Sequence, residues 1–491
     1  MKRDLRWYDH ITISIYWLGL NIASGIITPV LLPYLVAQFM PEAQKNTYLA
    51  IVRVIGLAVA MFVQPVAGML SDRSLSRWGR RRPYIVVGAV FNVLFLVIVG
   101  LSPSFVHSDL DALIQPLLGV TVAYAVLMVG TVLLQVSSNV AHGALQGLIP
   151  DMVPDHQRGR ASGVKAVFEL LPVFLVLFIG PLVDSGKVGL VVGIIVAGFL
   201  LSALVTALCV HETPLQERPA VKVGENVLRL LALTAIFVAV TRVAVWGVQA
   251  SGRALGAVQA SIALQVILVG LAGLLGMAGS IVIGVYLGAR VGIGKDAGAH
   301  TGFIWWVVNR LLFLAAVGSI QGFAQYFLAD VLHIPNAATM TSILMGAVAG
   351  FLLPSALGGG YLADRIGRKR LVVLSGFVAA AGAVLLLFST SMPLVIVSGC
   401  IIGLGAGTFM ATNWALGTDL APAEDAGRYL GISNLAGAGA GIVGAGIGGP
   451  MADSFNALQP GLGYLVIFAI YAALFVLSSL VILRVRVPDK A

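Results

Sequence analysis

Carboxylates inside long apolar segments are the residues of this chain best suited to proton chemistry. Of the 21 Asp and Glu residues, only Glu169 falls clearly within such a segment, while Asp9 lies at the start of the first one. An ionisable side chain is costly in hydrocarbon and is therefore a functional candidate. Glu169 is a candidate proton carrier. Lys165, one helical turn earlier, equally permits a structural i,i+4 ion pair.

His142 and Arg310 are the other ionisable candidates. An imidazole can change its charge near neutral pH, so His142 is a second candidate for proton coupling. A neutral, hydrogen-bonded histidine is the ordinary alternative. Arg310 keeps its charge and needs an acceptor, for which Asp419, Glu169 or an anionic substrate are the options.

Two short polar stretches between apolar segments repeat one pattern of acidic and basic residues. Residues 68–83 read GMLSDRSLSRWGRRRP and residues 360–370 read GYLADRIGRKR. In each hairpin an aspartate, Asp72 or Asp364, ends an apolar helix and can accept from backbone amides or nearby arginines. The candidate partners are Arg73 and Arg80 in the first copy and Arg365 and Arg368 in the second. Gly79 and Gly367 permit a tight turn.

A second motif also occurs once in each half. Asp151 and Arg160 have the same sequence spacing as Asp419 and Arg428, and each pair follows an apolar segment. Simple topological signals are one interpretation of both repeats. The residues of the two repeats are Gly68, Asp72, Arg73, Gly79, Arg80, Asp151, Arg160, Asp364, Arg365, Gly367, Arg368, Asp419 and Arg428.

Long apolar helices must position these residues. The chain of 491 residues is 59% apolar and only 10% charged, whereas soluble domains are about a quarter charged. Apolar periodicity predicts about fourteen membrane-spanning helices and therefore an all-α polytopic membrane protein. The predicted spans are 11–36, 47–70, 83–101, 117–146, 162–183, 188–210, 227–248, 260–288, 302–327, 338–362, 371–389, 393–416, 428–451 and 461–483.

The spans divide into two sets of six with an inserted pair. We expect an N-terminal six-helix bundle at 1–210, a linker with two inserted helices at 211–300, and a C-terminal bundle at 301–491. The inserted pair should lie at the periphery. Lys and Arg concentrate in alternate connections, which predicts cytoplasmic termini in the cell (inner) membrane. The net charge of +9 then reflects topology in a lipid bilayer and argues against a nucleic-acid partner.

Several functional classes lack their sequence signals. The two cysteines, Cys209 and Cys400, both lie in apolar runs, which excludes a disulfide framework. The sequence has no phosphate-binding glycine loop, so ATP-driven transport is not expected. We therefore expect no enzyme activity, no cofactor and no metal site, and we expect a monomer.

The duplicated hairpin resembles the loops that join helices two and three, and eight and nine, in transporters of the major facilitator superfamily. This resemblance implies two six-helix bundles and alternating access to a site between them. It also implies that the residues of the two repeats form a conformational latch, and we take them as the predicted latch residues. The longer spacing of the first hairpin, with NVAHGALQGLIPD at 139–151, is similar to the glycoside–pentoside–hexuronide group and its sucrose–proton symporters. Their fourth-helix aspartate and arginine align with Gln135 and Gln146, so sucrose-type proton chemistry does not carry over.

The resemblance also implies that the first, fourth, seventh and tenth helices line the substrate cavity. A neutral, hydrogen-bonding pocket with an aromatic residue suits a polyhydroxylated or amphipathic solute. Interhelical hydrogen bonding is the alternative role, and we expect about half of the set to face the cavity. The candidate substrate-binding residues are Asn21, Gln135, Asn139, His142, Asn309, Arg310, Gln321, Gln325, Asn413 and Trp414.

Three functions remain compatible with the sequence. The leading hypothesis is a secondary transporter that moves a small sugar or glycoside-like solute, coupled to protons. The second is an exporter of lipophilic compounds. The third is a non-transporting assembly factor for pigment complexes, because RRPYI at 81–85 is similar to a stretch found in such proteins.

Overall fold

The computed structural model describes residues 4–217, 223–292, 294, 301–420 and 426–485, without the side chains of 114, 223 and 426–436. These residues form helices and their connections, and no β-strand occurs among them. Thirteen segments of the described chain are long and apolar enough to cross a membrane. Helix α18 (Ala426–Leu458) occupies the remaining predicted span. The predicted all-α polytopic class is confirmed.

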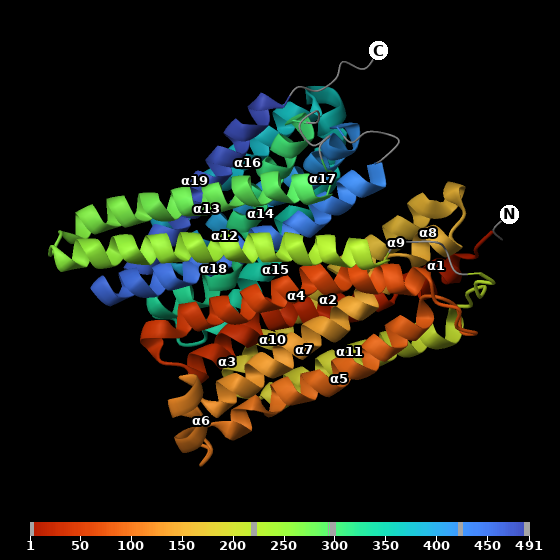
Figure 1. Ribbon diagram of the computed structural model, residues 1–491, viewed down its shortest axis with the longest axis horizontal. Helices are drawn as coiled ribbons and strands as arrows, with labels where there is room; N and C mark the ends of the chain where they lie inside the picture. The colour runs from red at the N-terminus through yellow and green to blue at the C-terminus, as the bar shows by residue number, and fades with distance from the viewer. Residues whose placement is uncertain (1–3, 218–222, 293, 295–300, 421–425, 486–491) are drawn as a thin grey trace. The chain divides into compact units, whose positions relative to one another are not determined.

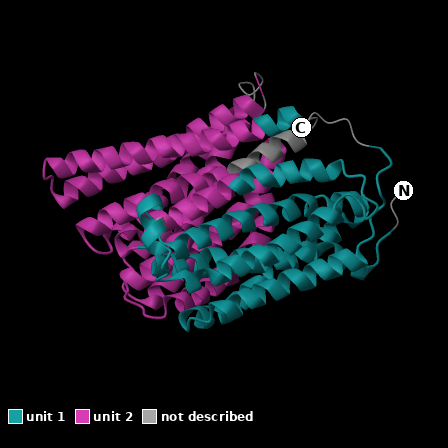
Figure 2. Cartoon of the chain, turned by 60° about the horizontal axis from the view of Figure 1, so that its bottom comes forward, with its two compact units in different colours: residues 1–40, 59–228 teal, residues 41–58, 229–491 magenta. Residues whose placement is uncertain are grey.

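The first compact unit comprises Met1–Met40 and Val59–Leu228 (Figure 2). Its helices are α1 (Trp7–Ser14), α2 (Tyr16–Ile26), α3 (Leu32–Phe39), α5 (Arg82–Leu101), α6 (Asp111–Leu118), α7 (Val122–Leu145), α8 (Leu148–Met152), α9 (Arg158–Leu170), α10 (Pro172–Asp184) and α11 (Val188–Cys209). Helix α5 packs on α7 and α11, and α2 packs on α10 and α11. A π-helical turn at Ile27–Leu31 separates α2 from α3. Pro29, within this turn, has no N–H to donate to a regular helix.

The second compact unit comprises Pro41–Ala58 and Arg229–Ala491. Its helices include α13 (Ile262–Gly292), α14 (Thr301–Asp330), α15 (Ala337–Ile366), α16 (Arg368–Leu387), α17 (Met392–Leu420), α18 and α19 (Leu462–Val481). Helices α15 and α16 pack on α17, while α14 packs on α18 and α19. The aromatic core of this unit includes Phe313, whose ring stacks on that of Phe409 at 3.7 Å between centres.

Two helices have residues in both units: α4 (Lys45–Asp72) and α12 (Val223–Ala257). The units thus differ from the predicted division in two places. The inserted pair α12 and α13, which runs side by side in Figure 1, groups with the C-terminal helices. Helix α13 packs on α14, α18 and α19, and Arg242 of α12 is exposed. The first part of α4 also belongs to this unit, although the sequence assigned it to the N-terminal bundle.

Candidate functional site

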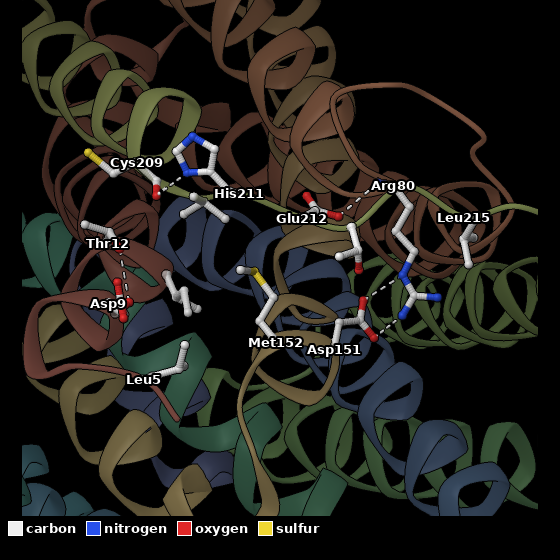
Figure 3. A pocket seen from close by; sticks show the side chains of 13 residues that line it. Leu5, Asp9, Thr12, Arg80, Asp151, Met152, Cys209, His211, Glu212 and Leu215 are labelled. Atoms are coloured by element: carbon white, nitrogen blue, oxygen red, sulfur yellow. Dashed lines mark hydrogen bonds and ion pairs between the residues drawn. The ribbon is translucent and has the colours of Figure 1, made fainter. Parts of the chain in front are cut away.

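The N-terminal hairpin is built around the carboxylate of Asp151. Helix α4 ends at Asp72, α5 begins at Arg82, and α8 presents Asp151 to the turn between them. The Nε atom of Arg80 donates to Asp151 Oδ2 at 2.9 Å (Figure 3). The Nε atom of Arg81 donates to the same oxygen at 2.8 Å. Arg81 also forms an ion pair with Asp72. Because Arg81 is only 5% exposed, this guanidinium joins the ends of α4 and α8 in a largely dry environment.

Glu212 closes the same hairpin from the segment that follows α11. Its carboxylate accepts hydrogen bonds from the backbone N–H groups of residues 80, 81 and 82 at 2.9, 2.8 and 2.7 Å. These amides lie at the N-terminus of α5, where helical amides lack internal partners and negative charge is favoured. Gly79 makes the approach possible, because its φ of +97° is left-handed and a Cβ there would collide with Glu212.

The observed ion-pair partners differ in part from those predicted. Asp72 pairs with Arg81, which was not among the predicted latch residues. The sequence has three consecutive arginines, Arg80 to Arg82, and the helical start at Arg82 determines which of them points inward. Glu212 was also missed, because no local pattern connects it with a hairpin 130 residues earlier.

The C-terminal hairpin also turns at a glycine, but helix α15 continues to Ile366, directly before it. Gly367 also has a φ of +97°, and Arg368 Nη1 donates to Asp419 Oδ2 at 2.5 Å. The predicted glycine turns are therefore confirmed in both copies. Asp364 is exposed and forms no ion pair with the residues described here, while Arg365 lies over the ring of Tyr361 at 4.6 Å. Arg160 is exposed, and the side chain of Arg428 lies outside the described residues.

A cavity of about 920 Å³ adjoins the N-terminal hairpin (Figure 3). Its lining brings together the ends of α1, α8 and α11 with the segment after α11, and includes Asp9, Asp151, Cys209, His211 and Glu212. The thiol of Cys209 is exposed, whereas Cys400 is buried. The cavity therefore gives solvent access to the hairpin network from one side.

The first unit also gathers the candidate coupling residues. Lys165 Nζ lies 2.9 Å from Glu169 Oε1, which confirms the predicted i,i+4 pair on α9. The same ammonium lies over the ring of Trp17 on α2 at 4.1 Å. His142 on α7 meets that ring edge-on at 5.0 Å, and Gln146 Nε2 lies 3.4 Å from His142 Nε2. Glu169 and His142 are thus connected by one chain of contacts that runs through Lys165 and Trp17.

Two predicted binding residues in this unit use their amides within their own helices. Asn21 Nδ2 donates to the carbonyl of Trp17 at 2.8 Å. Asn139 Nδ2 donates to the carbonyl of Gln135 at 2.8 Å and lies 3.4 Å from its Oε1. Asn139 is buried, whereas Asn21 and Gln135 are half-buried.

In the second unit the candidates form a cluster around Arg310. Its guanidinium lies over the rings of Trp414 at 5.0 Å and Trp306 at 5.9 Å. Arg310 Nη1 lies 3.4 Å from Asn413 Oδ1, and Arg310 Nε is a buried donor with no acceptor among the described residues. The two carboxylates considered as its partners have other observed ion pairs, which are Asp419 with Arg368 and Glu169 with Lys165.

Asn309 and Asn413 connect helices instead of facing an open space. Asn413 Nδ2 donates to Asn309 Oδ1 at 2.7 Å, and Asn309 Nδ2 donates to the Ser478 carbonyl at 2.8 Å. Both asparagines are 0% exposed. They take the interhelical role that the sequence left open. Gln321 is exposed on α14, and Gln325 is buried.

A further polar network lies at the N-terminus of α4, within the second unit. The carboxylate of Asp453 accepts from Asn46 Nδ2 at 2.8 Å and from the Thr47 amide at 2.7 Å. Lys45 Nζ lies 2.7 Å from Asp330 Oδ1. Lys45, Asn46 and Asp453 are each buried. These contacts join the start of α4 to α14 and α18. They were not predicted from the sequence.

Comparisons with known proteins assign the fold to one superfamily. Residues 15–248 match the family described as MFS/sugar transport protein, and residues 306–491 match the Major Facilitator Superfamily. The crystal structure of a D-xylose–proton symporter has a TM-score of 0.64 to this chain at 15% sequence identity. The alignment covers 99% of this chain and 99% of the symporter chain. A mutant of the nucleoside transporter NupG has a TM-score of 0.64 at 12% identity and covers 97% of this chain and 99% of that one. The chain belongs to the major facilitator superfamily and is an integral, multi-pass membrane protein.

Several sequence relatives are named as sugar or inositol transporters. The minor myo-inositol transporter IolF of Bacillus subtilis is 31% identical over 30% of this chain and 33% of its own. The sucrose transport protein SUT1 of Oryza sativa subsp. japonica is 35% identical over 22% of this chain and 21% of its own. The glucose transporter GlcP of Staphylococcus epidermidis is 34% identical over 27% of this chain and 29% of its own. The matched stretches thus span about a third or less of these relatives.

Proposed function

We propose that this protein is a secondary transporter that moves a sugar or glycoside-like solute by alternating access, driven by a proton gradient. The observation that carries the proposal is the match of residues 15–248 to a sugar-transport family, together with relatives named as inositol, sucrose and glucose transporters. The predicted orientation, with both termini cytoplasmic in the inner membrane, belongs to the same proposal.

The hairpin networks support the alternating-access part. In each unit an arginine directly after the turn glycine, Arg80 or Arg368, contacts an aspartate. Asp151 lies on α8, just after the fourth helix of its half, and Asp419 lies in the last turn of the fourth helix of the other half. Such charge-assisted contacts are strong enough to hold one conformation and are few enough to break during a cycle. We propose that they latch the hairpin side of the membrane in one state and release it in the other.

The Lys165–Glu169 pair supports the coupling part. Both side chains are about a third exposed, at 30% and 32%, so water can deliver a proton to Glu169. Protonation of the carboxylate removes its attraction for the Lys165 ammonium. Because that ammonium also contacts Trp17, one proton can change the side-chain arrangement on α2 and α9 together.

The test is transport in proteoliposomes containing the purified protein and radiolabelled sucrose, myo-inositol or glucose. An imposed proton gradient should drive accumulation of at least one solute, and Glu169→Gln should abolish this accumulation while sparing solute exchange. Glu217→Gln, an exposed glutamate in the segment after α11, is the matched control and should behave as the natural protein. Gradient-driven accumulation that persists in Glu169→Gln would remove Glu169 from the mechanism and direct attention to His142 or to uniport.

A further inference from the structure

The indole of Trp17 is buried, yet its contacts are unusual for a core tryptophan. The residue is 6% exposed on α2. One face is covered by the Lys165 ammonium, 4.1 Å from the ring, and the imidazole of His142 lies perpendicular to the ring with 5.0 Å between centres. Packing by apolar neighbours alone would not place a charged group there. The ring is therefore hidden in part by a side chain that is able to leave.

The polar atom of the same ring lacks a partner. Trp17 Nε1 is a buried donor with no hydrogen-bond acceptor among the described residues. A buried indole N–H ordinarily finds an acceptor, because leaving the donor unpaired away from water is costly. An unpaired donor beside a removable cover is the arrangement expected where a ligand supplies the acceptor.

The Lys165 side chain, which covers the Trp17 ring, is held weakly. Lys165 is joined to Glu169 by an ion pair in which both side chains are about a third exposed. Ion pairs exposed to this extent contribute little to stability. Lys165 can thus move off the ring toward Glu169 without losing its counter-charge.

We propose that Trp17 is the stacking platform for the substrate ring and that Lys165 occupies this platform while substrate is absent. The inference rests on the proposed function, and it specifies the solute as a polyhydroxylated ring, either a pyranoside or a cyclitol. Such a ring has a C–H face that the electron-rich face of an indole attracts, in the position that the Lys165 ammonium now takes. A hydroxyl of the solute that extends past the edge of the indole would accept from Trp17 Nε1, whose N–H lies in the plane of the indole.

The test measures binding to the purified full-length protein by isothermal titration, with methyl glucoside, sucrose, myo-inositol and tetramethylammonium as probes. Trp17→Leu should weaken binding of the carbohydrate that the natural protein binds by at least about tenfold. Trp17→Phe, which keeps a ring but removes the N–H, should weaken it less. Lys165→Ala should tighten binding about two- to fivefold, because the competing ammonium is gone. Trp246→Leu and Lys187→Ala, both exposed residues, are the controls and should change nothing.

The double variant distinguishes a cover from a direct ligand. If Lys165 competes for the Trp17 face, Lys165→Ala should have no effect once Trp17→Leu is present. Weaker binding after Lys165→Ala in both backgrounds would make Lys165 a substrate ligand and overturn the inference. Melting temperatures of all variants check folding, and Trp17→Phe retains the aromatic packing.

The remaining outcomes separate this inference from the proposed function. Equal carbohydrate binding by the natural protein and by Trp17→Leu would refute the role of Trp17 as a stacking platform. It would not contradict the proposed sugar transport. Binding of tetramethylammonium but of none of the carbohydrates would refute both the stacking platform and the proposed function, because the Trp17 ring would then bind a cation. Binding of none of the four probes would also count against both.

Discussion

The Glu212 carboxylate offers the sharpest test of the N-terminal hairpin. It accepts hydrogen bonds from three backbone amides at 2.7–2.9 Å. These amides lie at the N-terminus of α5, where backbone N–H groups have no acceptor within the helix. Loss of a helix cap costs about 0.5–2 kcal/mol, and the charge at the helix N-terminus adds about 0.3–1 kcal/mol. We therefore expect Glu212→Ala to favour the uncapped hairpin by about 2 kcal/mol, roughly 30-fold in the equilibrium. Glu212→Gln, which keeps one acceptor oxygen, should cost about half as much.

Hydrogen–deuterium exchange reports this equilibrium directly, because an amide exchanges when its hydrogen bond opens. Exchange at residues 80–82 should accelerate roughly 30-fold in Glu212→Ala and less in Glu212→Gln. Glu217→Ala changes an exposed glutamate of the same segment and is the matched control. An unchanged exchange rate at residues 80–82 in Glu212→Ala, or an equal acceleration in the control, would refute the capping role. Cys209, which lines the adjoining cavity, gives a second readout through its alkylation rate.

Four further substitutions test the two hairpins and the start of α4. Gly79→Ala should accelerate exchange at residues 80–82 as Glu212→Ala does, because a Cβ collides with Glu212 and the positive φ is strained by about 1–2 kcal/mol. Asp72→Asn should raise the alkylation rate of Cys209 and slow transport, since it weakens the hold on the buried Arg81 guanidinium, whereas the exposed Asp364→Asn should change neither. Asp453→Asn should destabilise the start of α4 by about 1–3 kcal/mol, seen as a lower melting temperature and faster exchange at residues 46 and 47.

The fold was largely predictable because membrane helices are encoded locally. A span needs about 20 apolar residues, and the connections need polar residues or turn-forming glycines. The predicted span 371–389, for example, corresponds to α16 at Arg368–Leu387. What periodicity could not predict is the grouping of the first part of α4 with the C-terminal helices. That grouping depends on contacts such as Asn46–Asp453, whose partners are 407 residues apart.

The candidate site shows the same division between local and distant information. The Lys165–Glu169 pair was predictable because residues four apart share one helix face. Trp17 was not identified, since nothing in the sequence around it indicates that a lysine far along the chain covers its ring. Asn309 and Asn413 were identified as polar residues on cavity-lining helices, but composition cannot distinguish a ligand contact from an interhelical hydrogen bond.

The two hairpins show how one repeated motif acquires different networks. The arginine directly after the glycine, Arg80 or Arg368, contacts the same aspartate position in both units. The next residue differs: Arg81 bridges Asp151 and Asp72, whereas Lys369 Nζ donates to the carbonyls of residues 483 and 485. A planar guanidinium can bind two carboxylates at once, while an ammonium is a single compact charge. Lys369 is directed to these carbonyls, and Asp364 is exposed and has no ion-pair partner among the described residues. The aspartates also differ in place, since Asp72 lies seven residues before its glycine and Asp364 only three.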